Sequence, residues 1–175
     1  MSRASETSFP EIRLRPAEER DIPFLLELRR VTMQGVITNH YPWENGAQTE
    51  RVMLHFECAR MVSLHQESSD GGPENRNFIP ETDAGLLKVI PLSTGLELCQ
   101  IQLLPAWQGR GLGTRLIRMV QGEAKAAGLP LTLHVLRSNP ALALYRKLGF
   151  QIVESDAHSH TMRWSPAFSD PPEAP

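Results

Sequence analysis

A glycine-rich segment between an apolar run and an amphipathic helix constrains the fold of this chain more than any other feature. The segment reads Gln-Gly-Arg-Gly-Leu-Gly-Thr from Gln108 to Thr114, and it follows the apolar run 96–104, which Pro105 ends. From Gly111 to Ala127 the apolar residues recur on one helical face. The loop therefore presents unpaired backbone N–H groups at the positive end of a helix dipole, where glycines let an anion approach closely.

The spacing within this segment argues against two common phosphate-binding loops. A Walker loop needs Lys and then Ser or Thr after its last glycine, but here Leu112 stands before Gly113 and Thr114. A dinucleotide fingerprint needs a third glycine where Thr114 stands and an acidic residue after the next strand, 131–136, and this chain has neither. Each helix-dipole contribution is only ~0.3 to 1 kcal/mol, so several N–H donors and a larger ligand must act together.

The remaining pattern predicts one mixed α/β domain. Asp21 is a candidate N-cap with Pro23 in the first helical turn, Ser138 and Asn139 precede a helix with Pro140 at its first position, and Gly149 ends that helix. We expect strands at residues 12–14, 61–65, 86–90, 96–104, 131–136, 150–154 and 158–164, and helices at 21–31, 52–59, 111–127 and 140–148.

Domain boundaries follow from composition. We expect a single domain at residues 11–164, a disordered N-terminal tail at 1–10 and a disordered proline-rich tail at 165–175. The polar, glycine-containing stretch 67–77 predicts a long mobile loop.

Charge and composition exclude several classes of function. The 175 residues carry a formal net charge of -2, which provides no basic field for nucleic acid. No stretch approaches the ~20 apolar residues of a membrane span and the N-terminus lacks a signal-peptide core, so we expect a cytoplasmic protein. Two cysteines, Cys58 and Cys99, and six scattered histidines show no metal-binding spacing, so we expect free thiols and no catalytic metal.

Two motifs resemble those of the GNAT superfamily of N-acetyltransferases. Gln108, Gly111 and Gly113 match its signature of Gln or Arg, two residues, Gly, one residue, and Gly or Ala. About thirty residues later, the segment from Asn139 to Phe150 is similar to the family's Asn-to-Gly-Phe segment, through Ala143, Leu144, Tyr145, Leu148, Gly149 and Phe150. With the N-terminal strand and helices, the resemblance covers roughly residues 11–164.

The resemblance implies an α/β fold of the acyl-CoA N-acyltransferase type, with a mixed sheet splayed between strands 96–104 and 131–136. The pantetheine arm of acetyl-CoA would enter the gap and pair with the backbone there as an added strand. The pyrophosphate would lie on the loop amides, with the Thr114 hydroxyl beside it and Asn139 on the pantetheine. The implied cofactor-binding residues are Ile101, Leu103, Gln108, Gly109, Arg110, Gly111, Leu112, Gly113, Thr114 and Asn139.

The implied reaction is direct attack of a primary amine, from a small molecule or a peptide, on the acetyl thioester. Because an aliphatic amine has a pKa of ~10.4, a base or a water chain must remove its proton. By resemblance Tyr145 is the acid for the leaving thiolate. Glu97 stands where the histone-acetylating branch carries its base, although other relatives use a different residue or water. Backbone amides near Ile101 to Leu103 would stabilise the oxyanion.

Other functions remain open from the sequence. One is an acyl-CoA-binding sensor or regulatory module without turnover, and another is an acetyltransferase acting on a protein lysine or N-terminus. Acceptor recognition would come from the variable segments, namely Tyr41, Trp43, Glu44, the loop up to Asp83, and His158 and His160, which we expect on one strand face. Many relatives are dimers, so a homodimer is a candidate assembly.

Overall fold

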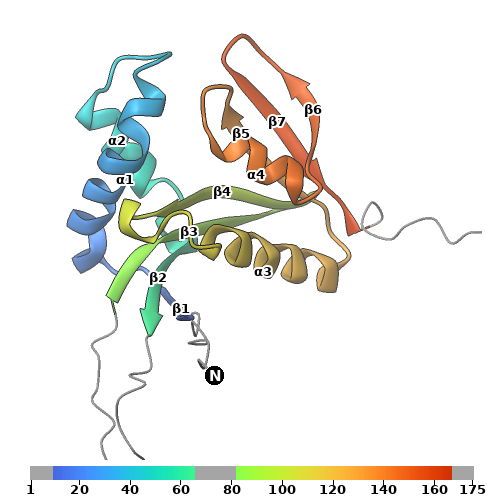
Figure 1. Cartoon of the computed structure of the whole chain (residues 1–175), viewed down its shortest axis with the longest axis horizontal. Coiled ribbons are helices and arrows are strands. Elements are labelled where there is room, and N and C mark those ends of the chain that lie inside the picture. The colour runs from blue at the N-terminus through green and yellow to red at the C-terminus, as the bar shows by residue number, and fades with distance from the viewer. Residues whose placement is uncertain (1–9, 66–81, 167–175) are drawn as a thin grey trace, which may run out of the picture.

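The computed structural model describes residues 10–65 and 82–166. These residues form one seven-stranded mixed sheet of order β1-β2-β3-β4-β5-β7-β6, together with four α-helices (Figure 1). The predicted order of strands and helices is confirmed. The elements are β1 Glu11–Pro16, α1 Ile22–Ile37, α2 Asn45–Met53, β2 Ala59–His65, β3 Thr82–Leu92, β4 Gly95–Leu103, α3 Leu112–Ala127, β5 Leu131–Leu136, α4 Ala141–Lys147, β6 Gln151–Ser155 and β7 Ser159–Trp164.

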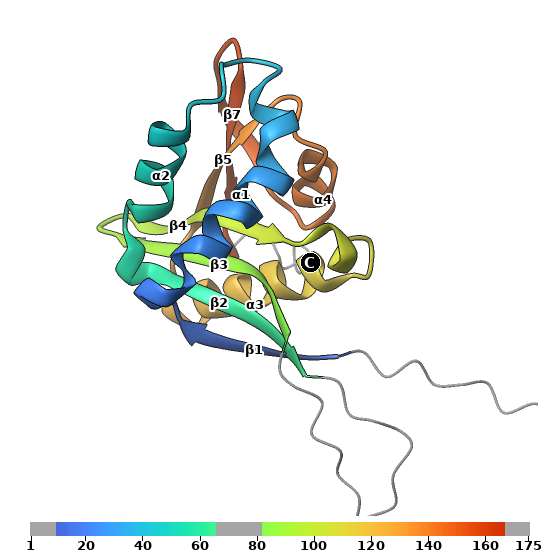
Figure 2. The ribbon, with the colours of Figure 1, turned by 90° about the vertical axis from the view of Figure 1, so that its left-hand side faces the viewer.

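Helices cover both faces of the sheet (Figure 2). The apolar stripe of α3, including Leu116 and Val120, packs in the larger core with side chains of β4, β5 and β7. On the opposite face, α1 and α2 bury Leu25, Leu28 and Val52 against the sheet residues Met61 and Leu86. None of the described helices is long and apolar enough to cross a membrane.

Strands β4 and β5 separate almost as soon as they meet. They run parallel, and their register contains two pairs, Leu96 with Leu131 and Glu97 with Thr132. Beyond these pairs the backbone of β4 continues to Leu103 without β5 beside it. Figure 1 shows β5, β7, β6 and α4 standing apart from β1 to β4. The expected splay of the sheet is therefore present.

The second helix lies earlier in the chain than its apolar pattern predicts, at Asn45–Met53 instead of 52–59. It ends at Met53 rather than near Ala59, because Leu54 is extended and His55 adopts a left-handed conformation with φ of 51°. From β3, the buried Lys88 donates Nζ hydrogen bonds to the carbonyls of Val52 (2.9 Å) and Leu54 (2.7 Å). A cation at a helix C-terminus satisfies carbonyls that lack an intrahelical partner and favours the dipole, so a residue of the sheet helps to end this helix.

Asp21 has a different role from the predicted helix cap. Helix α1 begins at Ile22 with Pro23 in its first turn, as expected, but the Asp21 carboxylate does not cap it. It accepts two hydrogen bonds from the Arg15 guanidinium, at 2.7 and 2.8 Å, and one from the Glu18 backbone N–H at 2.8 Å. Asp21 thereby fixes the turn between β1 and α1.

Two C-terminal boundaries also differ slightly from expectation. Helix α4 begins at Ala141, so Pro140 precedes it, and the Asn139 Oδ1 atom accepts the Ala141 N–H at 2.9 Å. Gly149 has the expected left-handed conformation, with φ of 85°. His158 lies in the turn before β7, and so the prediction that it shares a strand with His160 is wrong. The predicted loop 67–77 and most of both predicted tails lie outside the described residues.

The Arg15–Asp21 pair predicts an acid-sensitive contribution to stability. Hydrogen bonds from Arg15 hold the pKa of Asp21 below its ordinary value, with an opposing and smaller effect of burial. The pair therefore stabilises the fold above the ordinary carboxyl pKa of ~4 and loses that contribution as the pH falls through the lower folded pKa. We expect Asp21→Asn to lower the free energy of unfolding at pH 7 by about 2 kcal/mol in urea titrations.

The difference between wild type and Asp21→Asn should shrink at pH 3. Glu27→Gln is the matched control, because Glu27 also pairs with an arginine, Arg30, at 2.6 Å but on the exposed face of α1. That variant should change stability little. Equal losses in the two variants would contradict a special role for Asp21.

Candidate active site

A cavity of about 440 Å³ opens between α1, the end of β4, the glycine-rich loop and α4. It lies beside the part of β4 that β5 has left. Its lining residues come from α1, the end of β4, the glycine-rich loop, the first turns of α3, and α4 with the two residues before it. These are Thr32, Met33, Val36, Ile101, Gln102, Leu103, Gln108, Gly109, Gly111, Gly113, Thr114, Ile117, Asn139, Pro140, Ala141, Leu144 and Tyr145.

The glycine-rich loop has room for an anion. Gly109 and Gly111 have φ of 71° and 77°, and a Cβ built on either would have no atom within 4 Å. Gly111 immediately precedes α3, and no side chain caps the N-terminus of that helix. Free space, open conformations and uncapped N–H groups fit the pyrophosphate of a CoA thioester.

The side chains of three predicted loop residues make contacts that the sequence did not specify. The Gln108 side chain lines the cavity, but its Nε2 donates to the Leu103 carbonyl at 2.7 Å and so ties the loop to the end of β4. Arg110 is outside the lining, with its guanidinium 5.1 Å from the centre of the Trp107 ring. The Leu112 side chain is buried in the core, so only its backbone is placed near the loop.

Tyr145 lines the cavity from α4. Its side chain is 7% exposed and its ring packs edge-to-face on Phe150, with centroids 5.8 Å apart. Burial raises the pKa of Tyr145 to about 12. The phenol therefore keeps its proton at neutral pH and can donate a hydrogen bond into the cavity.

Glu97 is not among the residues that line this cavity. It belongs to the last residue pair that joins β4 to β5, opposite Thr132. Its Oε1 atom is 3.5 Å from Nδ1 of His134, and its side chain is 24% exposed. Glu97 thus sits where the two strands part, and a proton path from the cavity to this carboxylate requires an intervening group such as water.

The part of the cavity lining that α1 contributes was not predicted from the sequence. Thr32, Met33 and Val36 lie on one face of this helix, at intervals of one, three and four residues, and face the cavity together with Gln102 of β4. The periodic signal was present, because these positions continue the helical pattern begun before Val31. Pairing that face with β4 depends on contacts between distant segments.

Two of the residues predicted for acceptor recognition, Tyr41 and His158, belong to an aromatic cluster with His40. The rings of His40, Tyr41 and His158 pack together, with centroids 5.3 to 6.3 Å apart, and His40 Nε2 is 2.9 Å from Ser138 Oγ. The cluster joins the end of α1 to the β6–β7 turn, across the splayed sheet. The Trp43 indole N–H instead donates a hydrogen bond to the Asn45 side-chain oxygen.

His160 and Glu44 lie outside the aromatic cluster. The Nδ1 atom of His160 lies 2.7 Å from the Ser155 hydroxyl, and Glu44 precedes α2 without a side-chain capping bond.

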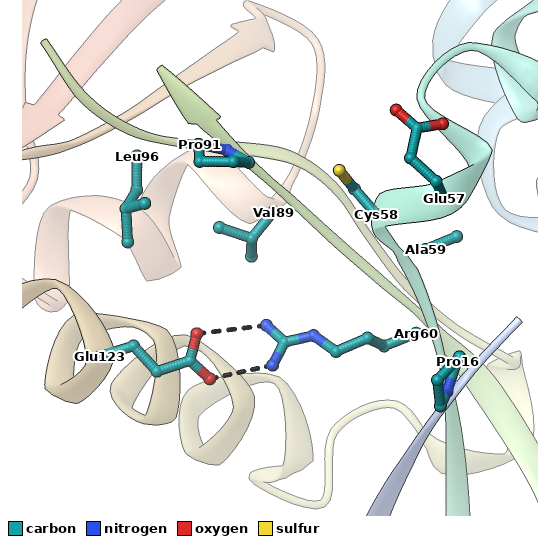
Figure 3. Close-up of a pocket in the computed structure, with 9 residues that line it drawn as sticks. All are labelled: Pro16, Glu57, Cys58, Ala59, Arg60, Val89, Pro91, Leu96 and Glu123. Atoms are coloured by element: carbon teal, nitrogen blue, oxygen red, sulfur yellow. Dashed lines mark hydrogen bonds and ion pairs between the residues drawn. The ribbon is translucent and has the colours of Figure 1, made fainter. Parts of the chain in front are cut away.

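A second hollow of about 390 Å³ holds none of the predicted site residues (Figure 3). Across it Arg60 and Glu123 form two hydrogen bonds, at 2.9 and 3.3 Å, and thereby satisfy each other's charge. Its lining is otherwise mostly apolar, apart from Glu57 and Cys58. The two charged side chains that face each other across this hollow are therefore already paired.

In residues 10–65 and 82–166, no group of three or more histidine, cysteine and acidic side chains is placed to hold a metal ion. Cys58 and Cys99 are both free thiols.

Comparison with known proteins identifies a similar domain and a similar fold. The model of the acetyltransferase (GNAT) domain family matches residues 77–152. Over 75 aligned residues, the chain is 39% identical to the N-alpha-acetyltransferase RimI of Mycobacterium tuberculosis (strain ATCC 25618 / H37Rv). This match covers 38% of the chain and 47% of RimI, so it spans about half the length of that relative.

Solved structures extend the similarity to nearly the whole chain. The PaiA N-acetyltransferase of Thermoplasma acidophilum, in complex with coenzyme A, is 16% identical with a TM-score of 0.63 over 89% of this chain and 99% of that one. A domain from Methanocaldococcus jannaschii DSM 2661 is 15% identical with a TM-score of 0.69 over 90% and 99%. At these identities the similarity concerns the fold, and the predicted GNAT-like fold is confirmed.

Two glycines at opposite ends of α3 provide a test of the anion site. Gly111 and Gly128 both have left-handed conformations, with φ of 77° and 67°, and both have open space around a built Cβ. Gly111→Val and Gly128→Val should therefore lose similar stability through backbone strain, about 1 to 2 kcal/mol. Only Gly111→Val places its side chain in the anion site, so only it should weaken acetyl-CoA binding, by at least ~10-fold.

Calorimetric titration of both folded variants with acetyl-CoA measures this difference. Equal affinity in the two variants would remove the loop from the binding site.

Proposed function

The chain belongs to the GNAT superfamily of N-acetyltransferases, and on this premise we propose that it transfers an acetyl group from acetyl-CoA to a primary amine. One observation carries the proposal. The same cavity is lined by the glycine-rich loop, by the unpaired side of β4 and by the protonated Tyr145. An anion site, a strand edge and a proton donor meet the needs of a phosphate-bearing thioester.

The proposed acetyl-CoA position uses groups already described. The pyrophosphate lies on the amides of the loop from Gln108 to Gly113, where the cavity has space beside Gly109 and Gly111. The pantetheine follows the backbone of Ile101 and Leu103. It forms with these residues the backbone hydrogen bonds that they would form with β5 in a continuous sheet. Asn139 and Thr114 line the same path.

The reaction moves one proton from nitrogen to sulfur. The neutral amine attacks the acetyl carbon, a C–N bond forms, the C–S bond breaks, and CoA leaves as a thiolate that is then protonated. Full transfer from a phenol of pKa about 12 to a thiolate of pKa ~8.5 would be uphill by about 5 kcal/mol. Tyr145 therefore assists mainly by hydrogen bonding to the sulfur as its charge develops, and backbone N–H groups of β4 face the oxyanion.

Removal of the amine proton is assigned to Glu97 acting through water. Its position where β4 and β5 part, near His134, supports a proton relay toward solvent. Its absence from the cavity lining argues against direct contact with the amine.

The similarity to RimI supports the α-amine of a peptide as one acceptor, alongside amines of small molecules. The test begins with calorimetry of the purified chain against acetyl-CoA, with NAD and ATP as controls. We expect micromolar and selective binding of acetyl-CoA, followed by CoA release that depends on an added amine.

Binding without turnover across a broad amine panel would instead favour an acyl-CoA sensor. An absence of binding would overturn both functions.

Tyr145→Phe tests the assigned proton donor. The phenylalanine ring preserves the packing on Phe150, so acetyl-CoA affinity should change little. We expect kcat to fall by ~10²-fold or more, as for loss of one preorganised hydrogen-bond donor to a developing negative charge. Thr49→Val is the control, since it also removes one hydroxyl, but from an exposed residue of α2 that does not line the cavity. Loss of activity in both variants, or in neither, would contradict the assignment.

A further inference from the structure

We propose that the acceptor amine also carries a carboxylate, which Arg29 binds beside the cavity, one turn of α1 before the lining residue Thr32. This inference rests on the proposed function and names the class of acceptor. It follows from the environment of one buried cation and from the hydrogen-bonding groups around it.

Arg29 is buried without an acidic partner. Its side chain is 7% exposed, and its Nε donates to the neutral Gln48 Oε1 of α2 at 2.8 Å. Within the described ranges 10–65 and 82–166, no carboxylate forms a salt bridge with Arg29, and its two Nη atoms have no hydrogen-bond partner. A buried guanidinium normally pairs with a carboxylate, because an unpaired buried charge costs several kcal/mol.

The position of Arg29 continues the wall of the cavity. Arg29, Thr32, Met33 and Val36 follow the i, i+3, i+4, i+7 spacing of one helical face, and the last three line the cavity. Arg29 therefore lies one turn further along the same face, toward α2.

The floor opposite this helical face also has an unpaired polar group. Gln102 of β4 lines the cavity, and Gln100 follows it on the same side of the strand. Gln100 Nε2 donates to the Arg51 carbonyl at 3.0 Å, which fixes the amide orientation, and its buried Oε1 has no partner in the described part of the chain. A hydrogen-bond acceptor thus faces α2 from the sheet, as Arg29 faces α2 through Gln48, and an ammonium and a carboxylate on one molecule would require one group of each kind.

The local charge favours an anion. Lys88 is fully buried, and its Nζ donates hydrogen bonds to the carbonyls of Val52 and Leu54. Burial, and to a lesser degree the nearby Arg51, lower the pKa of Arg29 to about 10, so it remains charged at neutral pH. The carboxylates nearest to these groups are Glu57, which acts on Lys88, and Glu97, which acts on Cys99.

Each of these two carboxylates lies near a histidine. Glu57 is 3.4 Å from His55 and Glu97 is 3.5 Å from His134. A carboxylate ligand would fit better than a point anion, because the free Nη atoms form a planar fork that binds two oxygens at once.

The test compares matched acceptors. Each carboxylate-bearing amine is assayed beside its neutral carboxamide, in three arms: α-amino acids, ω-amino acids, and short peptides with Asp or Glu as second residue beside Asn or Gln. We expect wild type to favour the carboxylate by at least ~30-fold in kcat/KM in at least one arm. The favoured arm identifies whether the carboxylate comes from a free amino acid or an acidic peptide.

Two variants isolate Arg29. Arg29→Gln should reduce the preference to within ~3-fold, whereas Arg30→Gln, which removes the exposed neighbouring arginine, should retain it. If Arg29→Gln fails to fold, Gln48→Glu serves instead, because it gives Arg29 an internal carboxylate and should reduce the preference while preserving acetylation of the neutral amides.

A binding measurement separates this inference from the proposed function. Calorimetry of the CoA-saturated protein with the same amine pairs should show tighter binding of the carboxylate form, with the difference lost in Arg29→Gln or Gln48→Glu. Acetylation of both forms with equal efficiency and affinity would overturn the inference and leave the acetyltransferase function intact. Absence of turnover with a retained carboxylate preference in binding would overturn the function and support the site.

Discussion

The early parting of β4 and β5 is the constraint on which the rest of the site depends. Two residue pairs hold these parallel strands together, and beyond Glu97 the edge of β4 faces a cavity instead of another strand. Backbone polar groups in such a place need partners. In the proposed complex, the amide groups of pantetheine would supply them, and the glycine-rich loop beyond Leu103 would receive the charged end of that ligand.

The two faces of the sheet have different chemistry. Toward α3 the core is apolar and closely packed, and toward α1 and α2 the sheet carries Lys88, Gln100 and Gln102 among its buried side chains. Buried polar groups cost free energy unless they are hydrogen-bonded. Lys88 meets this need by ending α2, whereas Gln100 and Gln102 each leave an amide oxygen unpaired in the described residues. The polar face therefore combines a structural anchor with groups suited to a ligand.

Local patterns predicted the elements and the motif well, since strand alternation, helical spacing and the Gln108–Gly113 loop depend on neighbours in sequence. The errors have a different origin. The end of α2 depends on Lys88, and the orientation of Asp21 depends on Arg15 across a turn. Likewise the wall from α1 and the isolation of Arg29 arise only when α1, α2 and β4 come together. No periodicity within one segment encodes such contacts.

The narrow junction between β4 and β5 has a mechanical consequence. With two ladder pairs between them, the sheet halves β1–β4 and β5–β7–β6 are joined chiefly by side chains of the shared core, including Leu98, Leu131 and α3 residues. Side-chain packing lacks the directionality of a hydrogen-bonded ladder and so tolerates small tilts that a continuous sheet would resist. The two halves of the sheet can thus tilt relative to each other about their shared apolar core, without a flexible loop as the hinge.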